Sequence, residues 1–456
     1  MEKEQFTNWF SRILLLSILP LLLLSFYAHP AADDFPISET ARDWGSYTTV
    51  VGYYKCWSAR YTSLFLMSLN PLAFGWFKGY KLGAPLLVAG LFFSLLYFFR
   101  RFSAGRLRAF TLTSVLLTVF LLNLPDLSGG LYYLGGSLFY QPGNMLLVLL
   151  AGSLIQFPPP LSLYGLSPSR WLAGAVQGLL LILLAGSNEI GMMLSLAIPV
   201  VGFLLQWYWE KKPVFSWLLF LFLSVACTII ILKSPATFYR MEASGSFERN
   251  MADAGLLAFR GMMQAVSGWL TSPSMLAGIA VLFFFSGEVA SEMSLPFSLR
   301  IFAMLSSLLL FYACFLPSFL GEGLLQGHTE NSLLFLFLFL LFLNLQLWKK
   351  PFLSAINSQT LKPVLLAGLM LALPFSPGFR QAVADLWSGE AAAYSAERDR
   401  RDSLMRNTPG DTVWVEALKH KPKSLFAGDI GDYPDPWYDN HFAAMYGKKW
   451  VGLKKP

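Results

Sequence analysis

Asp33 and Asp34 are adjacent carboxylates that follow the first long hydrophobic run, 9–27, where the polypeptide is expected to leave a membrane. A carboxylate held in a partly desolvated pocket has a raised pKa, and it can accept a proton from an incoming hydroxyl or amide. Adjacent carboxylates also repel each other, so the pair is maintained most easily where a cation or a hydrogen-bond donor satisfies it. The alternative is that this acidic pair only starts a helix, with an aspartate as its N-cap.

A second group of residues could bind a phosphate or a sugar. Arg60 follows in the same loop, and its guanidinium could hold a phosphate bidentately or anchor the chain among lipid headgroups. Asn188 and Glu189 stand at the junction of two hydrophobic runs, where an ionisable group is costly to desolvate and is therefore a functional candidate. The competing interpretation is a helix start with a polar cap and an acidic first turn.

Three further groups of residues also have both a functional and a structural interpretation. His328 and Glu330 precede a leucine- and phenylalanine-rich run, and they could hydrogen-bond a sugar or phosphate or could stand beside a simple helix cap. Tyr133 and Tyr140 could offer aromatic surfaces to a sugar or an isoprenoid, or could belong to an interfacial tyrosine belt. Arg260 lies in a polar segment whose cations could meet a pyrophosphate or could simply be solvated.

The composition determines what surrounds these residues. The chain has 456 residues, of which 55% are hydrophobic and only 13% charged, against roughly a quarter charged in soluble domains. Its mean hydropathy is +0.52 and its net charge is +7, without the clustered basic face that nucleic-acid binding requires. No phosphate-binding loop, zinc-protease motif or serine nucleophile elbow is present, and the four histidines show no paired metal-ligand spacing.

Apolar runs near the 20 residues needed to cross a bilayer predict an all-α polytopic membrane protein with about eleven transmembrane helices. The first run is interpreted as an uncleaved signal anchor. The stretch 61–77 is interrupted by Asn70-Pro71 and is predicted to lie in the membrane interface. The expected spans are 9–27, 82–99, 108–125, 138–156, 171–187, 189–209, 214–232, 273–290, 299–317, 331–348 and 362–377.

Basic residues between these spans predict the topology. With a cytoplasmic N-terminus, all the strongly basic loops fall inside, as the positive-inside rule requires. The first loop (28–81), the segment 233–272 and the C-terminal region 379–456 then lie outside, and 1–378 forms the transmembrane domain. The inner loops carry Arg100, Arg101, Arg106, Arg108, Arg170, Lys211, Lys212, Arg300, Lys349 and Lys350.

This order of features resembles the GT-C membrane glycosyltransferases, and more narrowly an uncharacterised bacterial GT-C-like family with an acidic-aromatic motif in the first loop. Ala59 stands where such proteins often have glycine. The matching stretches are Ala32-Asp33-Asp34-Phe35, Trp57-Ser58-Ala59-Arg60-Tyr61, Tyr133 with Gly136 and Tyr140, Glu189, and a tail motif with Asp435, Trp437, Asn440 and Tyr446-Gly447.

The resemblance implies a fold with outer-face juxtamembrane helices, and a transferase whose donor is a sugar on a polyprenyl phosphate or pyrophosphate. Asp34, narrowly preferred, or Asp33 would be the catalytic base, or would bind a divalent cation such as Mg²⁺ or Mn²⁺ if the enzyme is metal-dependent. Arg60 and loop cations such as Arg260 would neutralise the leaving phosphate. The outer-corner glutamate and the segment around 328–330 would bind sugar or acceptor, which is an envelope glycan, lipid or protein.

The sequence therefore leads to the hypothesis of a glycosyltransferase in the bacterial inner membrane, in contact with membrane lipids and not with nucleic acid. It predicts that Asp34, Arg60, Glu189 and Glu330 line one outward-facing cavity. A transporter or flippase for lipid-linked sugars is the first alternative, although it would need charges at mid-membrane depth or paired broken helices. A non-catalytic envelope-assembly protein is the second.

Overall fold

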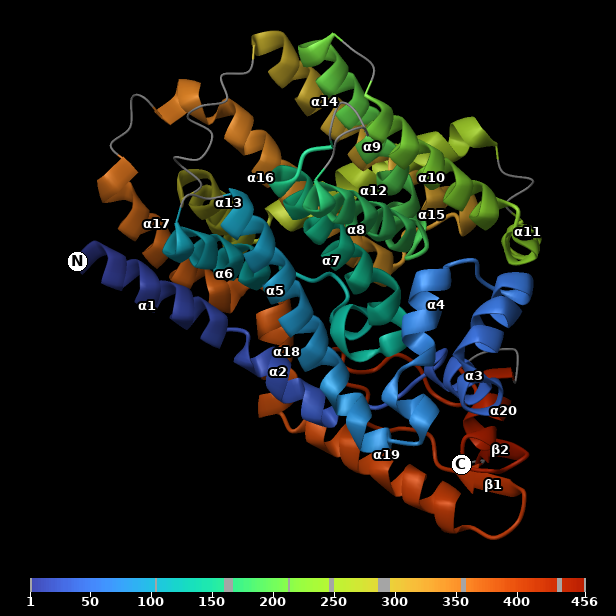
Figure 1. Ribbon diagram of the computed structural model, residues 1–456. Coiled ribbons are helices and arrows are strands. Elements are labelled where there is room, and N and C mark those ends of the chain that lie inside the picture. The colour runs from blue at the N-terminus through green and yellow to red at the C-terminus, as the bar shows by residue number, and fades with distance from the viewer. Residues whose placement is uncertain are drawn as a thin grey trace.

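The computed structural model is almost entirely helical, and its helices form a bundle with the C-terminal segment lying across one end (Figure 1). The prediction of an all-α protein is confirmed. The structure describes residues 2–102, 105–159, 167–211, 214–245, 250–285, 296–353, 358–432 and 437–454, so Lys212, Asp435 and the last residues of the predicted span 273–290 lie outside the described residues.

The N-terminal part of the chain alternates long and short helices. Its elements are α1 (Glu2–Leu16), α2 (Leu19–Leu24), η1 (Ser25–Tyr27), α3 (Asp34–Cys56), α4 (Tyr61–Ser68), η2 (Pro71–Phe74), η3 (Phe77–Leu82), α5 (Gly83–Phe102), α6 (Arg106–Leu122) and the π-helical turn η4 (Ser128–Tyr132).

The middle of the chain supplies most of the apolar helices. They are α7 (Leu134–Gln156), α8 (Pro168–Ala185), α9 (Glu189–Glu210), α10 (Phe215–Leu232), α11 (Pro235–Ala243), α12 (Met251–Leu270), α13 (Pro273–Phe285), α14 (Phe297–Ala313), α15 (Leu316–Gly321), α16 (Gly327–Leu353) and α17 (Ser358–Ala372) with η7 (Leu373–Phe375).

Among the described residues, eight helical segments are long and apolar enough to cross a membrane, or up to ten if two bent pairs each count as one. The protein is thus a multi-pass membrane protein by helix length and composition, with fewer qualifying spans than the predicted eleven. The eight are Thr7–Tyr27, Phe77–Phe102, Leu134–Gln156, Pro168–Ala185, Glu189–Glu210, Phe215–Leu232, Phe297–Gly321 and Gly327–Trp348.

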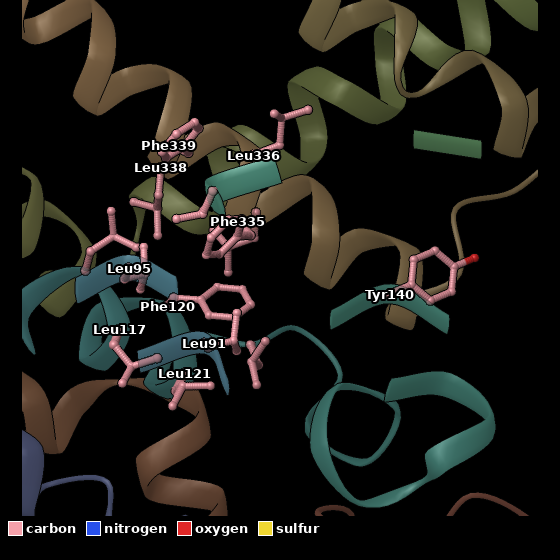
Figure 2. Close-up of a cluster of buried hydrophobic side chains, with 14 of the residues drawn as sticks. Leu91, Leu95, Leu117, Phe120, Leu121, Tyr140, Phe335, Leu336, Leu338 and Phe339 are labelled. Atoms are coloured by element: carbon pink, nitrogen blue, oxygen red, sulfur yellow. The ribbon is translucent and has the colours of Figure 1, made fainter. Parts of the chain in front are cut away.

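Helix α6 explains part of the difference in count. It has 17 residues and is buried almost throughout, because α1, α5 and α13 pack around it. A helix that is hydrophobic on every side belongs in the core of a bundle, and the sequence pattern alone does not distinguish it from a lipid-facing span. In Figure 2, Phe120 of α6 lies beside Phe335 of α16, with ring centroids 5.1 Å apart. This contact is part of the main hydrophobic core.

The stretch 61–77 does not form a single helix. The α-helical part, α4, has only 8 residues and ends before Asn70-Pro71, where the Asn70 side chain accepts the Leu72 N–H and donates to the Ser38 hydroxyl. Gly75 then adopts a left-handed conformation with a φ of 69°. No piece of this stretch reaches the length of a membrane span.

Two segments expected as loops are largely helical. The first loop contains α3, a 23-residue helix kinked at Gly45, where φ is 80° and ψ is 160°. The segment 233–272 contains α11 and α12, and α12 meets α13 at an angle of 86°. These helices are polar or amphipathic, so hydrophobic run length did not detect them.

The C-terminal segment folds back onto the first loop. It consists of α18 (Pro377–Trp387), α19 (Glu390–Asn407), β1 (Thr412–Val415), α20 (Trp437–Ala444) and β2 (Trp450–Leu453). Strand β1 pairs in parallel with β2, and Gly389, where φ is 78°, lies between α18 and α19.

A second hydrophobic core joins this segment to the rest of the protein. Val413 and Phe442 of the C-terminal segment pack with Phe35 and Leu72 of the N-terminal part, and the Phe35 and Phe442 rings meet edge to face at 4.8 Å. His441 Nδ1 lies 2.6 Å from Glu39 Oε2 in the same interface. In Figure 1, α20 accordingly lies against α3. We call this end of the bundle, which carries Asp33, the Asp33 end.

Candidate functional site

Asp34 is fully buried and holds three parts of the chain together. One carboxylate oxygen accepts the Ala31 N–H at 2.9 Å and contacts the Tyr80 hydroxyl at 2.6 Å, and the other accepts the Gly135 N–H at 2.8 Å. Burial raises the pKa of Asp34 to about 7, while hydrogen bonds from Tyr80, Ala31 and Gly135 oppose the rise. Asp34 therefore has the surroundings of a structural anchor.

Both protonation states of Asp34 can be satisfied in this arrangement. The Tyr80 hydroxyl lies 2.6 Å from Asp34 Oδ2 and 2.9 Å from the Tyr132 carbonyl. An ionised Asp34 accepts the Tyr80 proton; a neutral Asp34 donates to the Tyr80 oxygen, which then donates to the Tyr132 carbonyl. In either state the Asp34 carboxyl keeps a hydrogen bond with the Tyr80 hydroxyl.

Asp33 is half-buried and faces a different set of partners. Its carboxylate is hydrogen-bonded by the side chains of Tyr438 and Tyr133, and its N–H donates to the Tyr133 hydroxyl at 3.3 Å. Burial raises the pKa of Asp33, and the two tyrosines, followed by the charges of Arg240 and Arg60, limit the rise. Asp33 precedes α3 but does not cap it with its side chain. Of the acidic pair, Asp33 is the carboxylate that a second reactant can reach.

Arg60 and Glu189 form an ion pair across more than a hundred residues of sequence. Arg60 Nε and Nη2 donate to Glu189 Oε1 at 3.0 and 2.8 Å, with the two side chains 18% and 36% exposed. The guanidinium also lies over the rings of Phe139 and Tyr140, at 5.7 and 5.6 Å from their centroids. Contacts of this kind fix the direction of a guanidinium better than solvent would.

Neighbouring residues fix both members of this pair. Asn188 caps α9 by accepting the Gly191 N–H at 2.8 Å, and it donates to the Phe139 carbonyl at 2.9 Å. The Tyr61 hydroxyl donates to the Ile182 carbonyl at 2.6 Å, which ties the start of α4 to the end of α8. Asn188 is thus a cap that holds the corner, in agreement with the structural alternative for that residue.

Arg240 of α11 brings a second guanidinium to the same end. Its Nη2 donates to Glu322 Oε1 at 3.2 Å, and the guanidinium lies 5.8 Å from the ring centroid of Trp57. Its charge acts on Asp33 and Glu189, as the charge of Arg60 does. The arrangement is therefore two guanidiniums, each with its own carboxylate and aromatic ring, whose charges both act on the half-buried Asp33.

Tyr140 and His328 complete this cluster. The Tyr140 hydroxyl accepts a hydrogen bond from Thr329 at 2.9 Å, and its ring lies 5.0 Å from the His328 ring. Arg60 and Arg240 both act electrostatically on His328. We call the set Asp33, Arg60, Tyr133, Tyr140, Glu189, Arg240, Glu322, His328 and Tyr438 the Asp33 cluster.

Two sequence candidates lie outside the cluster. Glu330 accepts the indole N–H of Trp269 at 3.0 Å, so its carboxylate is directed toward α12. Arg260 is exposed on α12, and no ion-pair partner for it is found in the described part of the chain. The expected grouping of Asp34, Arg60, Glu189 and Glu330 is therefore only half formed, because Asp34 is turned inward and Glu330 sideways.

Sequence reasoning missed Arg240, Glu322, Trp57 and Tyr438 as site residues. Arg240 was visible only as one of several cations in its segment, and no periodicity singled it out. Tyr438 lies in the aromatic C-terminal stretch, where its role depends on the strand pairing that places α20. Neither contact had a local signal in the sequence.

The acidic pair does not form a divalent-cation site. Asp34 is saturated by Ala31, Tyr80 and Gly135, whereas Asp33 faces Tyr133 and Tyr438 on the other side. Within the described ranges, no three or more of the His, Cys, Asp and Glu side chains gather as a ligand set. The residues present therefore do not fit the divalent cation, Mg²⁺ or Mn²⁺, that the resemblance implies for a metal-dependent enzyme.

These features define a multi-pass helical membrane protein with a charged and aromatic cluster at one end. No protein-family model, curated protein or solved structure matches the chain.

Proposed function

We propose that the protein is an integral-membrane glycosyltransferase that takes a sugar from a polyprenyl-linked phosphate or pyrophosphate donor. The observation that carries the proposal is a half-buried carboxylate, Asp33, on which the charges of two guanidiniums, Arg60 and Arg240, both act. A lipid-phosphate leaving group needs paired cations, and an incoming hydroxyl needs a base; both requirements are met at the Asp33 end. In this proposal that end faces the outside of the bacterial inner membrane and the N-terminus is cytoplasmic.

The proposed reaction is a single displacement. Asp33 accepts the proton of the acceptor hydroxyl while the hydroxyl oxygen attacks the anomeric carbon. The bond from that carbon to the phosphate oxygen breaks, and the lipid phosphate leaves with the electron pair. Arg60 and Arg240 stabilise the charge that develops on the phosphate, because preorganised guanidiniums act strongly in a partly desolvated site. Attack opposite the leaving group inverts the anomeric configuration.

Asp33 replaces Asp34 as the proposed base on geometric grounds. A general base must reach the proton that it abstracts, and the Asp34 oxygens are fully buried beneath backbone donors. Burial raises the pKa of Asp33 from its ordinary value, which makes its ionised form a stronger base. Tyr438 and Tyr133 hold that carboxylate in position, and Tyr140 and His328 would bind the sugar or the acceptor.

The test uses the full chain in lipid nanodiscs with synthetic polyprenyl phosphate-linked sugars. Release of free polyprenyl phosphate and formation of a new glycoside are followed by mass spectrometry with envelope extract as the acceptor source. We expect turnover by the unmodified protein and loss of turnover in Asp33→Asn, while Asp43→Asn, an exposed aspartate paired with Arg42, keeps it. Equal turnover in the unmodified protein and Asp33→Asn overturns the role of Asp33.

The same nanodisc material separates the two alternatives. A flippase would move the labelled donor between leaflets without consuming it, and an assembly protein would do neither. Transbilayer movement without formation of polyprenyl phosphate therefore replaces the glycosyltransferase proposal with a transport function.

A further inference from the structure

A separate group of arginines lies at the far end of α5 from Asp33. Arg100 and Arg101 occupy the last turn of α5, and Arg106 begins α6. Together with Tyr97 and Phe93 they line a pocket of about 540 Å³. Because α5 has 20 residues at about 1.5 Å rise each, this pocket lies roughly 30 Å from the Asp33 end. We call it the arginine end.

The three arginines have no acidic partner in the described part of the chain. The Arg101 guanidinium lies over the Tyr97 ring, at 5.4 Å from its centroid. The surrounding stretch, 44–125, contains no aspartate or glutamate, so only a residue distant in sequence could supply a carboxylate. Like charges gathered around one pocket repel each other, so an anion bound among them would stabilise the arrangement.

Apolar side chains of α5, Phe93 and Leu96, also line the pocket. Phe93 is 65% exposed on the flank of α5 although its surroundings are hydrophobic, as expected for a side chain that contacts acyl chains. A phosphate bound between the arginines would therefore lie at the boundary between water and hydrocarbon. That boundary is where the headgroup of a phospholipid lies.

An apolar groove adjoins this pocket. It has a volume of about 400 Å³, runs between α7, α8 and α10, and is lined by Gly174, Gly178 and Leu223 among other residues. Gln156 at its edge accepts a hydrogen bond from Tyr97 of the arginine pocket at 3.3 Å, so the two spaces are neighbours. Arg170 lines the groove near the start of α8, on the side of the arginine end.

We propose that the arginine end is a binding site for an anionic phospholipid, with the phosphate among Arg100, Arg101 and Arg106 and an acyl chain along the groove between α7, α8 and α10. Two independent observations support one occupant: a cationic pocket with no acidic partner among the described residues, and an apolar groove beside it. Basic pockets between membrane helices are suited to anionic headgroups, and guanidiniums match phosphate oxygens bidentately. The proposal does not depend on the reaction at the Asp33 end.

The experiment measures lipid retention by the delipidated full chain in detergent, using native mass spectrometry with added dioleoylphosphatidylglycerol or dioleoylphosphatidylcholine. We expect the anionic lipid to be retained over the zwitterionic one. Replacing Arg100, Arg101 and Arg106 together by glutamine should weaken retention on the order of 100-fold, at about fivefold per cation near an anionic headgroup. Arg380→Gln, which removes an exposed cation on α18, should leave retention unchanged. Equal retention of both lipids, or an unaffected triple variant, overturns the proposal.

A second variant tests the groove independently of charge. A side chain added at Gly174 meets no atom within 4 Å, so Gly174→Leu would occupy the groove without disturbing the helix. We expect it to weaken retention of phosphatidylglycerol while leaving the helical content and elution volume unchanged. If it shifts the protein between oligomeric states and leaves lipid retention intact, the groove belongs to a second copy of the chain and the lipid proposal fails.

A soluble competitor distinguishes the lipid from a free anion. Inorganic phosphate at millimolar concentration should not displace phosphatidylglycerol, because it lacks the acyl chain. Complete displacement would assign the pocket to a soluble phosphate and would overturn the lipid assignment. If the triple variant does not fold, Arg106→Gln alone and Gly174→Leu give the same readouts.

Discussion

Arg60 and Arg240 at the Asp33 end each contact a carboxylate and an aromatic ring, whereas the three arginines at the other end have no acidic partner among the described residues. The difference arises from tertiary folding, because Arg60 lies in the same acid-free stretch, 44–125, as the three arginines of the other end. Glu189 and Glu322 come from sequence positions far from their arginines, so folding creates these pairs. At the arginine end, folding brings no described carboxylate to the three guanidiniums.

The comparison shows how the same side chain can serve two physical roles. A guanidinium held by a charge-assisted hydrogen bond and a ring has a fixed direction, which a transition state requires. An unpaired guanidinium can reorient toward any anion that reaches it, which suits an exchangeable lipid. The following predictions test this distinction, from the largest expected effect to the smallest.

Asp33→Asn should lower transfer activity by about 10²–10⁴-fold, because the substitution removes the general base without removing its hydrogen-bond partners. Donor consumption under single-turnover conditions measures the loss. The thermal unfolding temperature should stay close to that of the unmodified protein, since Asn can still accept from Tyr133 and Tyr438. A comparable loss of activity from a substitution at the arginine end would mean that the two ends do not have separate roles.

Tyr438→Phe should move the pH dependence of transfer upward. The tyrosine hydrogen bond favours the ionised carboxylate, so its loss raises the pKa of Asp33 further. A hydrogen bond to a charged group contributes about 1.5–3 kcal/mol, equivalent to about 1–2 pH units. In the unmodified protein, activity should rise with pH as Asp33 loses its proton. If the pH–rate profiles of kcat/KM for the two proteins have the same midpoint, Tyr438 does not act on the pKa of Asp33.

Glu189→Gln should destabilise the folded state by about 1–2 kcal/mol, because it leaves Arg60 partly buried beside two rings without a counter-charge. This free energy lies between the small contribution of an exposed ion pair and the larger cost of breaking a fully buried one, because the Glu189 and Arg60 side chains are 36% and 18% exposed. Unfolding in detergent, followed by intrinsic fluorescence, measures the change. Arg60→Gln combined with Glu189→Gln should recover part of the loss.

Arg106→Gln should change the unfolding free energy by no more than about 0.5 kcal/mol, since no ion pair is broken. The same fluorescence measurement in lipid-free detergent gives the value, and it forms the matched contrast to Glu189→Gln. A loss similar to that of Glu189→Gln would mean that Arg106 has a structural partner and that the two ends are alike.

The sequence supported the class of fold better than the details of the site. Hydrophobic run length predicted a helical membrane protein. It did not reveal that α6 is enclosed on all sides, because a buried helix and a lipid-facing helix have the same composition. Arg60 and Glu189 were each chosen separately as candidates, but only the fold brings them within 3.0 Å.

Residues close together in one helix show why the membership of the Asp33 cluster could not be predicted from the sequence. His328 and Glu330 differ by two positions, which is roughly 200° around an α-helix, so only one of them can face the Asp33 cluster. Asp33 and Asp34 diverge for a similar reason at the start of α3. Which member of each pair faces the site depends on helix rotation, and tertiary packing sets that rotation.

Helix α20 lies between β1 and β2 in the sequence, and this order has a consequence for biosynthesis. Tyr438 contacts Asp33 from a helix that precedes β2, and β2 pairs with β1 from Trp450 onward. The strand pairing that seats this helix cannot form until residue 453 has been translated and has passed through the ribosomal exit tunnel. The nascent chain can therefore insert its membrane helices one by one while Asp33 still lacks its contact with Tyr438, and that contact forms only after synthesis has reached β2.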